Sequence, residues 1–141
     1  MKGNKPNIII RLTGDNPFVD KDILEYMIKY FSAHYKNLDY LCNNGFGNFH
    51  KRKVPPGIDI QMYKMSSFLK MSDLVYKLKI NKKYLEHPPL YFYTKGKDNF
   101  KIKNIKLPIK YRVSHFRSVT VDRIDDFKKI KKIYSYFKKK N

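Results

Sequence analysis

Short apolar runs alternate with longer amphipathic stretches along this chain, and that alternation is the strongest constraint on its fold. Residues 7–12 form a β-branched run bounded by Pro6 and a turn, which is typical of a buried strand. Residues 21–32 carry apolar side chains at helical spacing, and Asp20 in front of them suits a helix N-cap. Because strand-like and helix-like segments keep alternating, we expect an α/β fold.

The other elements follow from the same two periodicities. We expect strands at residues 39–42, 58–63, 100–105 and 118–121, helices at 66–78 and 123–138, and one helical turn at 81–87. Residues 58–63 alternate in polarity, which predicts a strand with one buried face. Residues 90–93 are apolar and aromatic and fit either a strand or a buried helix. No repeat or linker interrupts the series, so we expect the 141 residues to form a single domain.

Capping residues predict where these helices begin and end. Ser66 or Ser67 can cap the helix that ends near Leu78, and Pro88-Pro89 should stop the turn at 81–87. Asp122 is a plausible N-cap for the last helix, and the basic tail at 138–141 suits the negative end of its dipole. The apolar side chains expected to face inward from this helix are Ile124, Phe127, Ile130, Ile133 or Tyr134, and Phe137.

Residues 43–57 show neither periodicity. The stretch is polar, contains glycines, and carries Lys51-Arg52-Lys53 and Pro55-Pro56. Long irregular segments of this kind lie on protein surfaces and often carry binding residues. We therefore expect a mobile surface loop beside a ligand.

The chain is strongly basic, with 31 Lys and Arg against 12 Asp and Glu and a net charge of +19. Only 5 of the cations are arginine, whereas nucleic-acid recognition often uses arginine because its planar fork binds phosphate and guanine bidentately. A composition rich in Lys, Ile, Asn and Tyr also results from an AT-rich coding sequence. The charge therefore indicates affinity for a polyanion or nucleotide without identifying it.

Several classes of protein are excluded by the same composition. The single cysteine, Cys42, cannot form an internal disulfide. No apolar run approaches the ~18 residues of a membrane span, and Ile8-Ile9-Ile10 is too short for the apolar core of a signal peptide. We expect a soluble cytoplasmic protein with no membrane partner.

Two aspartates follow predicted strands at points where the chain turns. Asp15 comes after the strand at 7–12, and Asp122 comes after the strand at 118–121. Ligands of open α/β sheets bind at the carboxyl ends of strands, where two carboxylates could hold Mg²⁺ together with phosphate oxygens. Both residues also have structural explanations, because Asp15 lies in a turn-forming Gly-Asp-Asn-Pro and Asp122 can cap a helix. Spacing alone leaves both interpretations open.

Six segments carry recognisable motifs in one order along nearly the whole chain. They are Arg11–Asp20 (R-x-T-G-D-x-P-h-h-D), Asp39–Asn43 (D-Y-h-S-N), Gly57–Tyr63 (G-h-D-h-E-h-F), Glu86–Tyr93 (E-H-V-T-P-Y-h-Y), Phe100–Ile105 (F-x-h-x-N-h) and Val119–Phe127 (h-T-V-D-x-x-E-D-F). This series resembles the cytidylyltransferase-like family of spore coat polysaccharide biosynthesis. That family is related to the acylneuraminate and 3-deoxy-manno-octulosonate cytidylyltransferases.

The resemblance implies a fold, a reaction and a set of site residues. The fold is the three-layer α/β sandwich of the nucleotide-diphospho-sugar transferases. The reaction is transfer of CMP from CTP, or of another nucleotidyl group, to a sugar or sugar acid. Carried over by position, Asp15 and Asp122 are the catalytic pair that holds Mg²⁺ or another divalent cation. The residues expected to bind substrate are Arg11, Asn16, Asn43, Asp59 and His87.

The resemblance covers only the C-terminal part of the family's domain. The family's first strand and its glycine-rich triphosphate loop have no counterpart before Arg11, so we expect a sheet without its leading strands. Such a chain would work with an N-terminal partner fragment or as a homodimer, or be inactive alone. Two alternatives remain: a basic module that binds RNA or single-stranded nucleic acid, and a non-catalytic fragment that completes another subunit.

Overall fold

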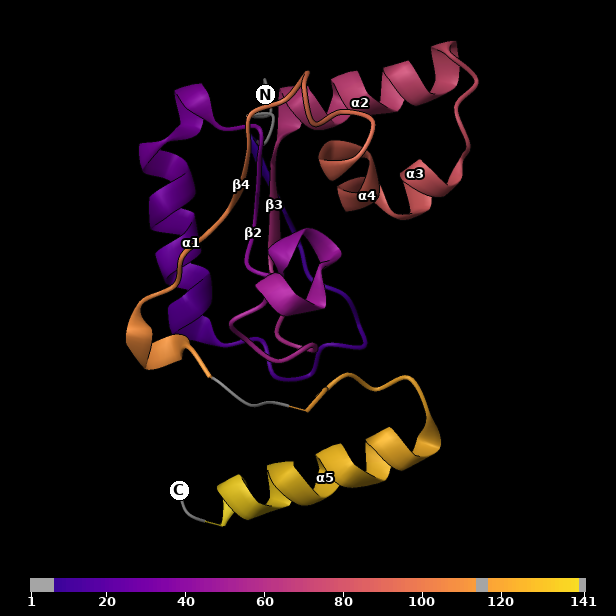
Figure 1. Cartoon of the computed structure of the whole chain (residues 1–141). Helices are drawn as coiled ribbons and strands as arrows, with labels where there is room; N and C mark the ends of the chain where they lie inside the picture. Colours follow the sequence, from indigo (N-terminus) through magenta and orange to yellow (C-terminus); the bar gives the residue numbers. More distant parts are fainter. Residues whose placement is uncertain (1–6, 114–116, 140–141) are drawn as a thin grey trace, which may run out of the picture.

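The computed structural model describes residues 7–113 and 117–139, and within these ranges a four-stranded sheet lies between layers of helices (Figure 1). The strands are β1 (Ile8–Arg11), β2 (Tyr40–Cys42), β3 (Gln61–Lys64) and β4 (Ile102–Asn104). The helices are α1 (Lys21–Ala33), α2 (Met65–Lys77), α3 (Lys83–Glu86), α4 (Pro88–Tyr93) and α5 (Ile124–Lys138). Short 3₁₀ turns occur at Tyr35–Asn37, Gly45–Gly47, Phe49–Lys51 and Ile109–Tyr111.

The sheet is mixed, with the strand order β1-β3-β2-β4. Strand β3 runs antiparallel to both of its neighbours, whereas β4 runs parallel to β2. One row of the sheet pairs Ile10 with Met62, Met62 with Leu41, and Leu41 with Lys103. The sheet therefore has β1 at one edge and β4 at the other.

Each face of the sheet carries its own apolar core. Helix α1 covers one face, and its Ile23, Met27 and Phe31 pack with Leu41 and Met62. Helices α2, α3 and α4 lie on the other face (Figure 1), over an aromatic cluster formed by Tyr40, Tyr63, Tyr84, Tyr91, Phe92 and Phe100. This is the three-layer α/β arrangement that the resemblance implied.

Helix α1 confirms its sequence prediction. The Asp20 carboxylate accepts a hydrogen bond from the Ile23 N–H at 2.9 Å, which satisfies one of the free donors of the first turn. Its apolar stripe, with Ile23, Met27 and Phe31 buried, faces the sheet as the 3.6-residue period required.

The predicted cap of α2 is wrong. The helix begins at Met65 and has Lys64 at its N-cap, because β3 runs directly into it. Ser67 is buried inside the first turn, and its hydroxyl donates to the Asp39 carboxylate. That bond ties the helix to the segment that leads into β2.

The ambiguous stretch at 90–93 is helical. Pro88 and Pro89 open α4 instead of only stopping the turn before them, since a proline fits the first helical position, where no backbone donor is needed. The turn itself forms as the short helix α3, which ends at Glu86.

The alternation in polarity at residues 58–63 predicted a strand with one exposed face, and this prediction is wrong. The strand β3 is shorter, at Gln61–Lys64, and its Gln61, Met62 and Tyr63 are all buried. Helices cover both faces of the sheet, so polar and apolar positions are enclosed alike. The surface position expected for residues 43–57 is also wrong in part, because Asn43, Arg52 and Val54 are buried.

The C-terminal region differs most from expectation. Residues 118–121 do not join the sheet, and the N-cap of α5 is Arg123, not Asp122. The Asp126 carboxylate accepts from the Arg123 N–H at 3.1 Å and so satisfies a donor at the start of the helix.

The apolar side chains of α5 are less buried than predicted. Ile130 is buried, but Phe127 and Tyr134 are 51% and 60% exposed. Figure 1 shows α5 apart from the sheet and its two helical layers. Residues 140–141 of the basic tail lie outside the described ranges.

Among the described helices, none combines the length and the apolar character that crossing a bilayer requires.

Candidate active site

A cavity of about 340 Å³ opens at the carboxyl end of β1. Its walls are formed by Arg11, Thr13, Asp15, Asn16, Asp59, Gln61, His87 and Thr120. A second cavity of about 240 Å³ shares Arg11, Gln61 and His87 with it and extends to Asn44 and Tyr93. Strand ends of open α/β sheets are the usual ligand sites, because the chain turns away there and leaves a crevice. Polar residues from five separate segments meet in this crevice.

Arg11 is the cation of the cavity wall. It is paired in register with Gln61, and its Nη1 donates to Gln61 Oε1 at 2.8 Å. The Tyr63 hydroxyl also donates to Gln61 Oε1, at 3.4 Å. The amide thus orients one edge of the guanidinium, and other donors of the fork remain available for an anionic ligand.

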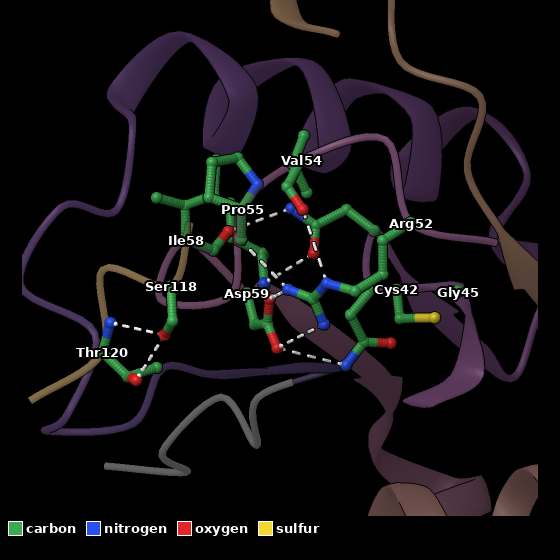
Figure 2. A network of polar contacts seen from close by, with 12 residues as sticks. Cys42, Gly45, Arg52, Val54, Pro55, Ile58, Asp59, Ser118 and Thr120 are labelled. Carbon is green, nitrogen blue, oxygen red and sulfur yellow. Dashed lines mark hydrogen bonds and ion pairs between the residues drawn. The ribbon is translucent and has the colours of Figure 1, made fainter. Parts of the chain in front are cut away.

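Asp59, which lines the cavity, forms an ion pair with Arg52, which does not line it. The guanidinium donates to both carboxylate oxygens, and Figure 2 shows the two groups facing each other. Arg52 also donates to the Val54 and Pro55 carbonyls at 3.4 and 3.1 Å. Because the side chain of Arg52 is only 7% exposed, these acceptors replace the water that it has lost. The pair closes the loop between β2 and β3 on itself.

Two asparagines behind the cavity hold the same loop. The Asn43 amide donates to the Ile58 carbonyl at 3.0 Å and accepts from the Ile60 N–H at 2.9 Å. Asn44 Nδ2 approaches Asp59 Oδ2 at 3.5 Å. Asn43 is therefore a positioning residue that keeps Asp59 at the wall, and it does not line the cavity itself.

The two predicted metal-binding aspartates lie on neighbouring segments. Asp15 lines the cavity, and its backbone carbonyl accepts from the Val121 N–H at 2.9 Å. The Asp122 carboxylate is exposed and does not line the cavity. It accepts at 2.8 Å from the hydroxyl of Thr120, which does line it. One backbone bond thus joins the two acidic segments at the mouth of the cavity.

Within the part of the chain that the structure describes, no cluster of three or more His, Cys, Asp or Glu side chains is placed to hold an ion. Mg²⁺ uses one or two carboxylates and takes its remaining ligands from water and substrate phosphates. Asp15 and Asp122 are the carboxylates that would supply such ligands, whereas the Asp59 carboxylate is engaged by Arg52.

Behind this site the sheet is an apolar environment that keeps its titratable groups neutral. Burial raises the pKa of the Tyr40 hydroxyl well above its ordinary value, and burial likewise raises the pKa of Tyr63. Burial is also the main cause of the raised pKa of the Cys42 thiol. These three side chains are fixed, uncharged packing groups and supply no nucleophile to the cavity.

The structure brings together five of the seven residues that the sequence analysis selected. Arg11, Asp15, Asn16, Asp59 and His87 line one cavity, Asn43 lies behind it, and Asp122 lies outside it. Arg52 and Thr120 were not selected. Arg52 stood in a run of basic residues without a pattern of its own, and Thr120 belonged to a predicted strand and to the motif at Val119–Phe127 but was given no role in the site.

The chain matches two known proteins over most of its length, although no protein-family model matches it. It is 28% identical over 130 residues to the spore coat polysaccharide biosynthesis protein SpsF of Bacillus subtilis (strain 168), covering 92% of this chain and 48% of SpsF. It also matches the structure of a cytidylyltransferase from Leptospira borgpetersenii serovar Hardjo-bovis (strain JB197), with a TM-score of 0.75 and 28% identity. The chain is a homologue of SpsF. The predicted resemblance and fold are confirmed.

The homology to SpsF covers about half of that protein. The match to the Leptospira cytidylyltransferase covers 92% of this chain and 49% of that protein.

Proposed function

We propose that this chain carries one side of a nucleotidyl transfer site, where CMP passes from CTP to a sugar or sugar acid for surface polysaccharide synthesis. The observation that carries the proposal is the cavity at the end of β1, where Arg11, Asp15, Asn16, Asp59 and His87 meet. The homology to SpsF and to a cytidylyltransferase supports cytidylyl chemistry over nucleic-acid binding.

Asp15 and Asp122 are the residues that would hold Mg²⁺. When bound, the ion would neutralise charge on the α-phosphoryl group during in-line attack. The chain would contribute two carboxylates on segments that a backbone bond, from the Val121 N–H to the Asp15 carbonyl, joins. The Thr120 hydroxyl orients the Asp122 carboxylate by donating to it.

The other residues would bind and orient the substrates. Arg11, already oriented by Gln61, presents its remaining guanidinium donors to a phosphate or a sugar carboxylate. Asn16 and His87 also line the cavity, and their amide and imidazole groups can form hydrogen bonds with sugar hydroxyls. Asp59 contributes shape and a carboxylate that Arg52 neutralises, so an anionic substrate meets little repulsion there.

Isothermal calorimetry with CTP, with and without Mg²⁺, tests this proposal. We would titrate the chain alone and the chain fused to the half of SpsF that it does not match, with ATP and a short RNA for comparison. The expected result is saturable CTP binding that needs Mg²⁺ and weakens by about tenfold or more in Asp15→Ala, since a charged metal ligand is lost. Sugar phosphates and sugar acids are then tested for turnover.

Asp73→Ala is the matched control, because Asp73 is an exposed carboxylate on α2, away from the cavity. It should leave CTP binding unchanged. CTP binding that ignores Mg²⁺ or survives Asp15→Ala in both proteins contradicts the proposal. Heat that appears with any polyanion and disappears as salt is added would instead indicate binding through net charge.

A further inference from the structure

One side chain, that of Gln61, borders both cavities of the candidate site. It lines the larger cavity of about 340 Å³ and the smaller one of about 240 Å³, as do Arg11 and His87. Gln61 lies on β3, an inner strand, where it is paired with Arg11 on β1 and with Cys42 on β2. Because Gln61 is only 7% exposed, the sheet fixes the chemical group that stands beside Arg11.

The carboxamide of Gln61 orients Arg11 without neutralising it. Gln61 Oε1 accepts from Arg11 Nη1 at 2.8 Å and from the Tyr63 hydroxyl at 3.4 Å. A glutamate has nearly the same shape and can accept the same two hydrogen bonds, but its carboxylate would form an ion pair with the guanidinium. The motif G-h-D-h-E-h-F, which Gly57–Tyr63 resembles, has glutamate at this position. The chain therefore departs from that motif by one charge beside Arg11.

No carboxylate in the described part of the chain replaces that missing charge. Among residues 7–113 and 117–139, no Asp or Glu forms an ion pair with Arg11. Asp59 lines the larger cavity together with Arg11, but its carboxylate is engaged by Arg52. The guanidinium of Arg11 thus keeps its full positive charge for a ligand.

The smaller cavity is the part of the site that this charge dominates. Its described lining contains no Asp or Glu and consists of Arg11, Asn44, Gln61, His87, Pro89, Leu90 and Tyr93. Arg11 is partly buried, and a cation surrounded by protein attracts an anion more strongly than one in bulk water, because less solvent screens it. The amides and the Tyr93 phenol can form hydrogen bonds with hydroxyls. A ligand that carries hydroxyls and one anionic group therefore suits this cavity better than an uncharged ligand.

We propose that Gln61 is a positioning residue that determines the charge preference of the site. It holds Arg11 in place and leaves its charge free, so that the smaller cavity selects a sugar by an anionic group, a carboxylate or a phosphate. A glutamate at the same position would cancel this preference. The assignment of that sugar as the acceptor of nucleotidyl transfer rests on the proposed function, whereas the preference itself is measured by binding alone.

Titration of the nitrogen-labelled protein with matched sugars, followed by NMR, tests the preference. The probes are glucuronate and glucose 1-phosphate, each compared with the uncharged methyl glucoside at constant ionic strength. Both the chain alone and its fusion to the non-matching half of SpsF are titrated. Gln61 is the only glutamine of the chain and Arg11 is one of 5 arginines, so their side-chain signals report binding at this cavity and not elsewhere on the basic surface.

At least one anionic probe should bind about tenfold or more tightly than the glucoside, because it gains a charge-assisted hydrogen bond. Tighter binding of glucuronate identifies a carboxylate as the preferred group, and tighter binding of glucose 1-phosphate identifies a phosphate.

Gln61→Glu should remove the preference. The anionic probe should bind about tenfold or more weakly, whereas binding of the glucoside should change by less than about twofold. A merely structural role of Gln61 would weaken both probes alike. Asn99→Asp is the matched control, because it makes the same change in net charge at an exposed residue that lines neither cavity, and it should leave the preference unchanged.

Two further variants keep the inference testable if Gln61→Glu does not fold. Gln61→Met keeps the position neutral and should retain the preference, whereas Arg11→Met removes the cation and should abolish it. The inference is overturned if neither anionic probe binds preferentially in either protein, or if the preference survives Gln61→Glu or Arg11→Met. It is also overturned if Gln61→Met loses the preference. A preference without Mg²⁺-dependent CTP binding would refute the proposed function and leave this inference standing, and CTP binding without a preference would do the reverse.

Discussion

The loop between β2 and β3 and the segment from Ser118 to α5 both border the cavity, but they are held in different ways. The loop is pinned by buried polar groups: the ion pair between Arg52 and Asp59, and the two backbone bonds of Asn43. The C-terminal segment is bound to the rest of the chain by two backbone hydrogen bonds. The Val119 N–H donates to the Pro56 carbonyl, and the Val121 N–H donates to the Asp15 carbonyl.

This difference bears on how the site is built. Elements with few buried contacts and exposed backbone bonds open at a lower free energy than packed ones. The wall with Arg11 and Asp59 is therefore expected to be rigid, whereas Thr120 and Asp122 lie on the part that opens most easily. A ligand that bridges Asp15 and Asp122 would stabilise the weaker part.

Removing Arg52 should have the largest effect on stability. Arg52→Met leaves Asp59 in a half-buried position without its counter-ion, and breaking a buried pair from one side costs about 3 to 5 kcal/mol. Urea unfolding would measure the change. Lys53→Met is the matched control, because Lys53 is exposed, and it should change stability by less than about 0.5 kcal/mol. Equal effects of the two variants would show that the pair does not hold the loop.

Gly57→Ala tests the contact between the two regions. Gly57 has φ +103°, and an added Cβ would lie 2.6 Å from the Val119 carbonyl carbon. Left-handed strain and this overlap together should cost about 2 to 3 kcal/mol and push residues 117–122 away from the body. Hydrogen exchange at Val119 and Val121 should accelerate. Gly14→Ala, where nothing lies within 4 Å of the added atom, should leave that exchange unchanged.

Asn43→Ala should cost about 2 kcal/mol, because two buried backbone groups lose their partner. Thermal unfolding measures the loss, and Asn99→Ala, at an exposed turn, is the control that should show none. If the C-terminal segment is independent, exchange at Val121 should not change in the Asn43 variant. A change there would show that the rigid loop supports the weaker region.

Local periodicity predicted those parts of the fold that depend on neighbouring residues. Strand β1 and helix α1 were predicted correctly, the strand from a bounded β-branched run and the helix from its helical spacing. Residues 118–121 have the composition of a strand, but the Val119 and Val121 N–H groups donate to the Pro56 and Asp15 carbonyls, and the segment does not enter the sheet. Strand pairing is a tertiary choice that composition cannot specify.

The candidate site was predictable as a group of residues but not as a geometry. Motif order selected Arg11, Asp15 and His87, and the fold brings them to one cavity. The partner of Asp59 was not predictable, because the loop must close before Arg52 can reach it. The spacing of apolar residues in α5 correctly predicted a helix. Periodicity does not tell whether a partner covers its apolar face, and Phe127 is half exposed.

Alkaline pH should destabilise the packed region through its buried tyrosines. Burial raises the pKa of Tyr40 and Tyr63, so the folded state keeps their protons at a pH where the unfolded state, with a pKa of about 10, has lost them. Their contribution is complete below about pH 10 and is lost above it, by up to about 1.4 kcal/mol per pH unit for each tyrosine. Tyr40→Phe should flatten this slope. It should cost little at pH 7, since the polar group beside the buried Tyr40 hydroxyl is the Cys42 thiol, which forms only weak hydrogen bonds. An unchanged slope in unfolding experiments between pH 9 and pH 11 would contradict the assignment.

The smallest effect is expected on α5. Phe127 is 51% exposed, so Phe127→Ser removes little buried surface and should change the stability of the chain alone by less than about 0.5 kcal/mol. Ile130→Ser on the same helix is the matched comparison, because Ile130 is buried, and it should cost at least about 1 kcal/mol. Urea unfolding of both variants measures the difference. If Phe127→Ser costs as much as Ile130→Ser, the helix packs more tightly than its exposure indicates. The contrast between the tightly held loop and the weakly held C-terminal segment then fails. If the cost of Phe127→Ser rises only in the fusion with the other half of SpsF, the apolar face of α5 is covered in the complete fold.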